Sequence, residues 1–125
     1  MQYKLKKIRS DASFREFFRL KKGNKTSIIV TAIKERFRNL VAYSAINKFL
    51  RGKGIHTPKT ISQHFNEGIM EIEDFGDNTL FHSIRKSKNI FPYYKKSINV
   101  ILKLQKIKPI NKIKIKLNRN LKLNN

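Results

Sequence analysis

A five-residue stretch, residues 21–25 (KKGNK), constrains the fold more than any other part of the chain. It separates two strand-like runs, residues 14–20 (FREFFRL) and 26–33 (TSIIVTAI), and it carries the Gly-Asn pair of a hairpin loop. A loop this short joins antiparallel strands only. A third strand-like run, residues 3–8, precedes them across a turn at residues 9–13. The first third of the chain therefore predicts a three-stranded antiparallel meander.

A helix and a second hairpin are predicted next. Residues 39–53 place apolar side chains at i, i+1, i+4, i+5, i+8 and i+9, which is the spacing of one helical face. These side chains are Val41, Ala42, Ala45, Ile46, Phe49 and Leu50. Gly52 and Gly54 end the helix, and residues 60–65 and 69–73 are two further strand-like runs. Residues after 78 then predict two helices, a short one at 79–86 and a longer one at 92–107.

The composition excludes several kinds of chemistry. The 125 residues suffice for one domain with a modest core. The absence of cysteine excludes disulfides and thiol catalysis, and the three scattered histidines lack partners at metal-ligand spacing, so no metal site is predicted. No apolar run approaches the roughly 20 residues of a membrane span. We therefore interpret the protein as soluble and cytoplasmic, without a membrane partner.

The net charge of +21 leaves a nucleic-acid partner open. Lys, Ile and Asn are all common, however, which is typical of a genome-wide base composition rather than of selection for binding. Lysine also far outnumbers arginine, the residue that bidentate phosphate recognition favours. No acidic residue follows Asp77, and residues 109–125 are interpreted as a poorly ordered or strand-like basic tail. A basic nucleic-acid-binding module is thus an alternative interpretation.

Three motifs occur in an order that is known from one enzyme family. They are residues 10–20 (SDASFREFFRL), residues 54–59 (GIHTPK) and residues 68–80 (GIMEIEDFGDNTL). Together they resemble the aminoglycoside phosphotransferase family, above all its branch of anomeric N-acetylmuramate and N-acetylglucosamine kinases. Each motif alone is weak, and the resemblance fades near Lys108.

The resemblance implies an α+β fold, the N-terminal lobe of a protein-kinase-like protein, with five antiparallel strands and one helix. Residues 1–73 would form this nucleotide-binding lobe and residues 74–78 the connector between lobes. Residues 79–108 would be the first helices of a truncated C-terminal lobe, and residues 109–125 the tail.

The resemblance also implies a turn that covers the nucleotide phosphates. Backbone N–H groups can approach phosphate closely where side chains are small. The residues that would form this turn are Ser10, Asp11, Ala12 and Ser13. The family usually has glycine at the position of Ser10, and the serine side chain here hinders the close approach of a phosphate to the backbone. The alternative is an ordinary hairpin turn.

A lysine at the end of the third predicted strand is a second candidate phosphate ligand. Residues 31–34 (TAIK) resemble the VAIK motif of protein kinases, whose lysine pairs with nucleotide phosphates. In those kinases a glutamate of the next helix orients the lysine. The predicted helix at residues 39–53 has no acidic residue, so Lys34 is either a phosphate ligand or an ordinary solvated lysine.

The connector is where the resemblance implies adenine binding. The carbonyl of Ile72 and the N–H of Asp74 would bind the base, and Glu71 would limit the depth of the pocket. Four of the chain's eight acidic residues gather here, and the alternative is that they form a solvated strand end.

The residues that such an enzyme uses for catalysis are missing from the sequence. Phosphoryl transfer needs an aspartate for the acceptor hydroxyl and further ligands for magnesium, and no carboxylate follows Asp77. No catalytic residue is therefore predicted. The sequence indicates the ATP- or GTP-binding part of a small-molecule kinase with an amino-sugar or similar acceptor, truncated before its catalytic loop and inactive alone. Magnesium and acceptor would bind only a full-length form. A non-catalytic, nucleotide-binding regulatory lobe is a further alternative.

Overall fold

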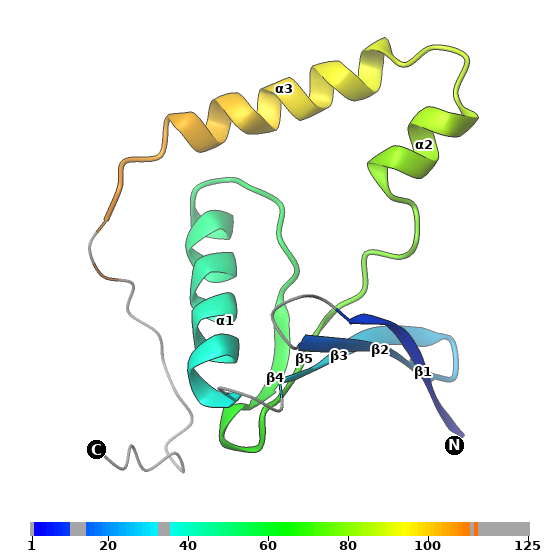
Figure 1. The fold of residues 1–125 in the computed structure, drawn as a ribbon, viewed down its shortest axis with the longest axis vertical. Helices are drawn as coiled ribbons and strands as arrows, with labels where there is room; N and C mark the ends of the chain where they lie inside the picture. The colour runs from blue at the N-terminus through cyan, green and yellow to red at the C-terminus, as the bar shows by residue number, and fades with distance from the viewer. Residues whose placement is uncertain (1, 11–14, 33–35, 111, 113–125) are drawn as a thin grey trace.

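The predicted α+β architecture is confirmed by a computed structural model, which describes residues 2–10, 15–32, 36–110 and 112 (Figure 1). A five-stranded antiparallel sheet carries helix α1, and helices α2 and α3 follow. The elements are β1 (Tyr3–Ser10), β2 (Arg15–Lys22), β3 (Lys25–Ala32), α1 (Arg36–Gly52), β4 (Thr60–His64), the 3-10 turn η1 (Phe65–Glu67), β5 (Ile69–Glu73), α2 (Leu80–Lys86) and α3 (Phe91–Gln105). This arrangement is compatible with the N-terminal lobe of a kinase-like protein.

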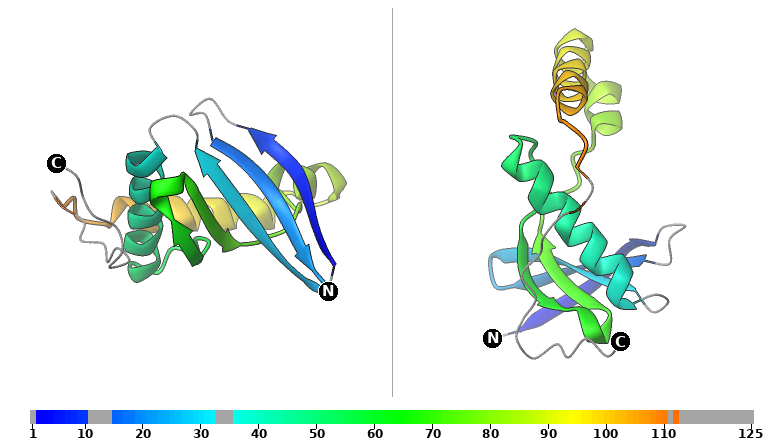
Figure 2. Two further views of the ribbon diagram at one scale, coloured as in Figure 1. Left: turned by 90° about the horizontal axis from the view of Figure 1, so that it is seen from below. Right: turned by 90° about the vertical axis from the view of Figure 1, so that its left-hand side faces the viewer.

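The strand order is β1-β2-β3-β5-β4, so the last strand in sequence lies inside the sheet (Figure 2). The first three strands form the predicted meander, and β4 and β5 form the predicted second hairpin. Gly68 ends η1 with a φ of +72°, a conformation that glycine adopts without strain, and this turns the chain back into β5. Its carbonyl accepts a hydrogen bond from the N–H of Ala32 at 2.9 Å, which ties the turn to the end of β3.

One face of the sheet forms the core together with α1 and η1. Alternating residues of β3 and β5 point to this face, as the two-residue period of a strand requires. The buried core residues are Phe17, Ile28, Val30, Ala32, Leu40, Phe65, Met70 and Ile72. The largest fully buried side chain is that of Phe65, in the turn between β4 and β5. The hydrophobic core among the described residues therefore lies between positions 17 and 72.

The contact face of α1 differs from the predicted one. The helix begins at Arg36, before the predicted position 39, and its fully buried residue is Leu40. Ala45 is buried as predicted, whereas Ile46 is exposed. Polar contacts replace apolar ones further along the helix, since Ser44 is buried and its hydroxyl lies 3.1 Å from that of Thr60. The expected apolar face is thus wrong at Ala42 and Ile46, which are exposed, whereas Val41, Phe49 and Leu50 are partly buried.

Helices α2 and α3 lie apart from the sheet, and neither contains a buried residue (Figures 1 and 2). Thr79 caps α2 by accepting a hydrogen bond from the N–H of His82 at 3.2 Å. Many apolar side chains of α3 are exposed, among them Phe91, Tyr94 and Ile98. The predicted tail at residues 109–125 lies outside the described residues, apart from positions 109, 110 and 112. No described helix is long and apolar enough to cross a membrane.

Two phenylalanines provide a matched test of where the core lies. We predict that Phe65→Ala lowers the free energy of unfolding by about 3–5 kcal/mol, because it empties a fully buried site. Phe81→Ala, at a side chain that is 70% exposed in α2, should change it by less than about 0.5 kcal/mol. Urea unfolding followed by circular dichroism measures both. Equal losses in the two variants would contradict the assignment of the core.

Candidate functional site

Two distant stretches of the chain meet through one arginine. Arg19 lies in β2, and Asp74 and Asp77 lie in the connector after β5. The Nε of Arg19 donates to Asp74 Oδ2 at 2.7 Å, and its Nη2 donates to Asp74 Oδ1 at 3.2 Å. The same guanidinium donates to Asp77, from Nη1 to Oδ2 at 3.0 Å and from Nη2 to Oδ1 at 2.9 Å. We call these three residues the Arg19 clamp.

The strand register brings the clamp residues together. Arg19 pairs with Ile28 across β2 and β3, and Ile28 pairs with Ile72 across β3 and β5. The three side chains therefore form one row on one face of the sheet. Asp74 follows Ile72 by two residues, so the alternation of the strand directs its carboxylate to the same face.

The carboxylates of the clamp are ionised at neutral pH. Arg19 holds the pKa of Asp74 below its ordinary value, chiefly by hydrogen bonding, and the backbone N–H of Gly76 adds to this lowering against the effect of burial. Arg19 likewise lowers the pKa of Asp77, and the two hydrogen-bonded carboxylates raise the pKa of Arg19. The Asp74 side chain is only 6% exposed, whereas that of Asp77 is 77% exposed. One cation between two anions gives the clamp itself a net charge of −1, and Lys6 adds a positive charge near Asp77.

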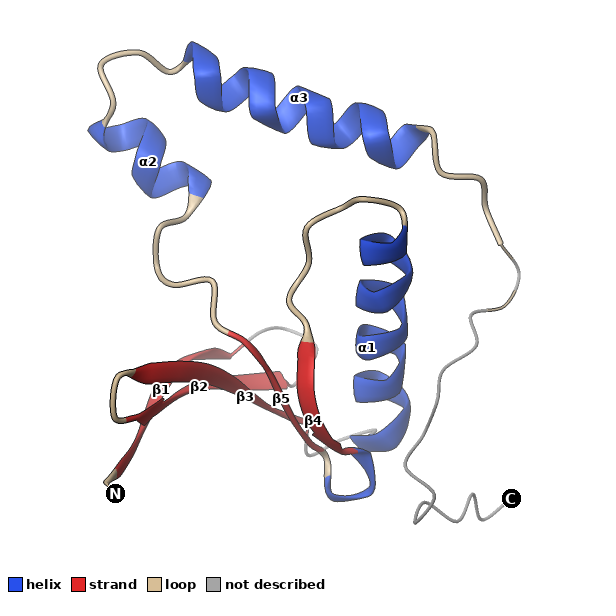
Figure 3. Cartoon of the chain, turned by 180° about the vertical axis from the view of Figure 1, so that it is seen from behind, coloured by secondary structure: helices blue, strands red, loops and turns tan. Residues whose placement is uncertain are grey.

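The connector itself is a folded turn between β5 and α2 (Figure 3). The N–H of Gly76 donates to Asp74 Oδ1 at 2.8 Å, and the N–H of Thr79 donates to the carbonyl of Asp77 at 2.9 Å. Gly76 has a φ of +78°, which a side chain would make unfavourable even though open space surrounds the position. The turn thus requires glycine for its backbone conformation rather than for room.

A cavity of about 430 Å³ lies beside the clamp. Its apolar lining comes from β1, β2, β3, α1, β5 and the two loops that approach them. The lining residues are Ile8, Phe17, Arg19, Ile28, Tyr43, Pro58, Ile72, Glu73, Asp74, Phe75, Gly76, Asp77, Asn78 and Thr79. Apolar walls thus meet a polar rim that is formed by the clamp and the connector.

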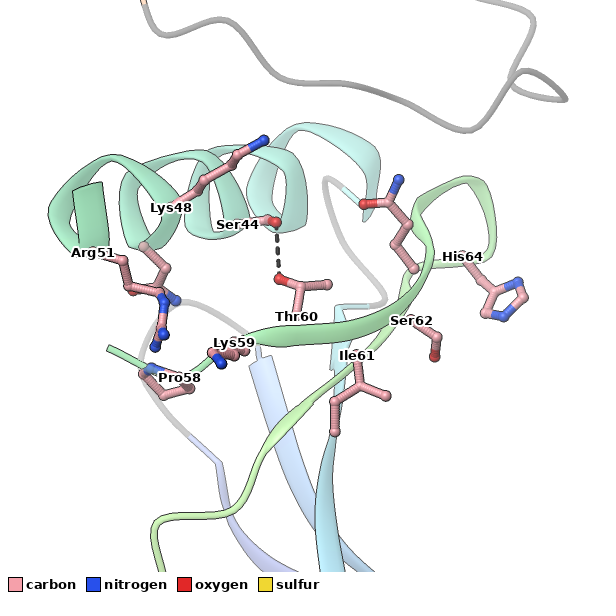
Figure 4. A pocket seen from close by; sticks show the side chains of 11 residues that line it. Ser44, Lys48, Arg51, Pro58, Lys59, Thr60, Ile61, Ser62 and His64 are labelled. Atoms are coloured by element: carbon pink, nitrogen blue, oxygen red, sulfur yellow. Dashed lines mark hydrogen bonds between the residues drawn. The ribbon is translucent and has the colours of Figure 1, made fainter. Parts of the chain in front are cut away.

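A larger cavity of about 670 Å³ lies between α1 and β4 (Figure 4). Its two sides are tied by the hydroxyls of Ser44 and Thr60, and Arg51 donates to the carbonyl of Thr57 near one end. Three of its eleven lining residues are Lys or Arg. This fraction is close to that of the whole chain, in which 29 of 125 residues are Lys or Arg. Its positive charge therefore reflects the composition of the chain and does not single it out as an anion site.

The predicted connector residues lie at the smaller cavity. Ile72 is buried in β5, where it pairs with Ile28 and Thr60, and its side chain lines the cavity with that of Asp74. The roles predicted for the carbonyl of Ile72 and the N–H of Asp74 stay predictions.

The predicted phosphate ligands are described only in part. Ser10 is the last residue of β1, and its backbone pairs with that of Glu16 across the hairpin. Asp11, Ala12, Ser13 and Lys34 lie outside the described residues. Their predicted contacts with phosphate therefore stay predictions.

Glu71 does not limit the cavity, contrary to the expectation from sequence. It lies on the other face of the sheet from Ile72 and accepts hydrogen bonds from the hydroxyls of Ser27 at 2.6 Å and Ser62 at 3.1 Å. Glu73 accepts a hydrogen bond from the N–H of Lys59 at 3.3 Å. The gathering of acidic residues here thus serves separate contacts on two faces of the sheet.

Sequence reasoning missed the clamp. Arg19 and Asp77 both belong to motifs that carried the family resemblance, and their position within those motifs was the signal that could have paired them. The pairing itself depends on the strand order, which puts β5 next to β3. Within the part of the chain that the structure describes, no group of three His, Cys, Asp or Glu side chains is placed to hold a metal ion.

A comparison with curated proteins supports a distant kinase-like relationship, with which the fold is compatible. The chain is similar to the N-acetylmuramate/N-acetylglucosamine kinase of Pseudomonas aeruginosa, with 26% identity over 100 residues. The match covers 78% of this chain and 28% of the relative, so the chain spans little more than a quarter of the relative's length. No protein-family model matches the chain, and neither does any solved structure.

The ionised clamp makes the stability of the fold sensitive to acid. Folding lowers the pKa of Asp74 below its ordinary 3.8. The clamp's contribution is therefore complete above that value and is lost as the pH falls through the lower pKa of the folded state. We predict that the difference in urea midpoint between the wild type and Asp74→Asn is constant above about pH 5 and shrinks below about pH 4.

Glu67→Gln is the matched control for this titration, because Glu67 is an exposed carboxylate outside the clamp. Its urea midpoint should follow that of the wild type at every pH. A wild-type advantage over Asp74→Asn that persists unchanged at the acid end would show that the ionised carboxylate is not the stabilising form.

Proposed function

We propose that this chain is the nucleotide-binding lobe of an ATP-dependent phosphotransferase of the small-molecule kinase type. The observation that carries the proposal is the cavity beside the Arg19 clamp, which is lined by residues of all three motifs that resemble the aminoglycoside phosphotransferase family. The distant similarity to an amino-sugar kinase supports the same reaction class.

The chemistry of the cavity suits a nucleotide base. Its volume falls within the roughly 300–1,000 Å³ of small-molecule sites. Phe17, Ile28 and Ile72 offer an apolar wall for a planar ring, and the connector backbone offers hydrogen-bonding groups at its edge. The net negative charge of the clamp repels phosphate, so the base would lie at the connector and the phosphates towards the turn after Ser10.

The same proposal separates binding from catalysis. An acceptor aspartate and magnesium ligands are needed for transfer, and the sequence has no carboxylate after Asp77. We therefore expect these 125 residues to bind ATP or GTP, in the cytoplasm, without transferring phosphate alone. An amino sugar or a similar hydroxyl compound is the proposed acceptor of the complete enzyme, by analogy with the name of the relative.

Isothermal titration calorimetry with ATP, adenosine and inorganic tripolyphosphate tests this function. The tripolyphosphate has a charge similar to that of the nucleotide and lacks the base, so it reports binding by the net charge of +21 alone. We predict that ATP binds more tightly than tripolyphosphate and keeps this advantage when salt is raised from about 0.15 M to about 0.5 M. No phosphate should be transferred to N-acetylglucosamine by the isolated chain.

Two matched variants locate the binding. Ile8→Asp puts a carboxylate at the edge of the cavity and should weaken ATP binding by about tenfold or more. Ile61→Asp, at another exposed strand position outside this cavity, should leave it unchanged. Equal binding of ATP and tripolyphosphate would overturn the proposal.

Two additions to these titrations, RNA as a ligand and the acceptor-binding part of a related kinase, distinguish the two alternatives. A basic nucleic-acid-binding module predicts a steep loss of affinity for RNA and tripolyphosphate alike as salt is raised. A non-catalytic regulatory lobe predicts nucleotide binding that stays without transfer even when the acceptor-binding part of a related kinase is added.

A further inference from the structure

We propose that Arg19 is a positioning residue, which holds the connector in the conformation that forms one wall of the nucleotide cavity. The inference rests on the proposed function and adds to it a residue that contacts the connector rather than the reacting groups. It also explains why Arg19 and Asp74, which belong to two different motifs and lie 55 positions apart in the sequence, contact each other.

Four of the five N–H groups of the Arg19 guanidinium donate to the connector. Its three nitrogens all donate to Asp74 or Asp77, in four hydrogen bonds between 2.7 and 3.2 Å. Arg19 is only 23% exposed, so water competes less for these bonds than at an open surface. A lysine would keep the charge and lose the planar fork that reaches both carboxylates at once.

The remaining contacts of the connector explain why an external tie matters. The bonds of Gly76 to Asp74 and of Thr79 to Asp77 are local, since they join residues two apart. They shape the turn but do not fix it relative to the sheet. The ring of Phe75 lies 4.6 Å from that of His56, and Arg19 ties the two ends of the turn to β2. Asp74 is also hydrogen-bonded to the side chain of Thr26 in β3, so loss of Arg19 would loosen chiefly the end of the connector at Asp77.

The exposure of Asp77 separates positioning from plain stabilisation. An exposed ion pair contributes little to global stability, typically less than about 1 kcal/mol, and Asp77 is largely in solvent. Yet it accepts two of the four bonds of the clamp. Removing the Asp77 carboxylate should thus loosen the connector and weaken nucleotide binding, while the urea midpoint of unfolding stays unchanged.

The test compares Asp77→Ala and Arg19→Lys with Glu67→Ala, an exposed carboxylate in η1 outside the cavity. Three quantities are measured on the full chain: amide hydrogen exchange at residues 74–79, the dissociation constant for ATP, and the urea midpoint. For Asp77→Ala we expect about three- to tenfold faster exchange at these amides, about three- to tenfold weaker ATP binding, and an unchanged midpoint. Arg19→Lys should show the same changes in exchange and binding, and Glu67→Ala none of them.

Each outcome decides one claim. Faster exchange with unchanged ATP affinity overturns the positioning role and leaves the proposed function standing. Unchanged exchange in both clamp variants overturns the inference directly, as does a urea midpoint of Asp77→Ala that falls in proportion to its ATP affinity. If the wild type binds no ATP, the proposed function fails, and the exchange data then show separately whether Arg19 fixes the connector.

Discussion

Strand β5 is hydrogen-bonded on both sides, to β3 and to β4, and the rest of the structure depends on this placement. It carries Met70 and Ile72 into the centre of the core, where α1 and η1 cover them. It also makes the chain leave the sheet from an interior position. The connector therefore starts beside β3, one strand away from β2, instead of at an outer edge, and the long side chain of Arg19 in β2 reaches it.

Most helices and strands of this fold can be predicted from local patterns of the sequence. The short loop after β2, the strand-like run of β3 and the glycines at the end of α1 predict the elements nearly to their ends. The strand order is not local, because periodicity fixes which face a residue takes but not which strand lies beside it. The face of α1 was predicted only in part, since Leu40 packs into the core and Ile46 does not. Helical spacing alone does not say where along the helix its contact with the sheet begins.

The residues of the candidate site could likewise be predicted only in part from the sequence. Family motifs drew attention to Ile72 and Asp74, and both line the cavity. Glu71 was misplaced because adjacent residues of a strand point to opposite faces, and its partners are hydroxyls on the far face. The ion pairs of Arg19 were not predicted, since they join residues whose proximity follows from the order of the sheet.

The confinement of the core to positions 17–72 has a consequence for how the chain is made. A ribosome releases the polypeptide from its N-terminus, and domains fold as their last core residue emerges. Here that residue is Ile72, and neither α2 nor α3 buries a side chain against the sheet. The sheet and α1 are thus complete while the later helices are still in the exit tunnel. The exposed apolar side chains of α3 then emerge beside a sheet whose described core residues are already buried.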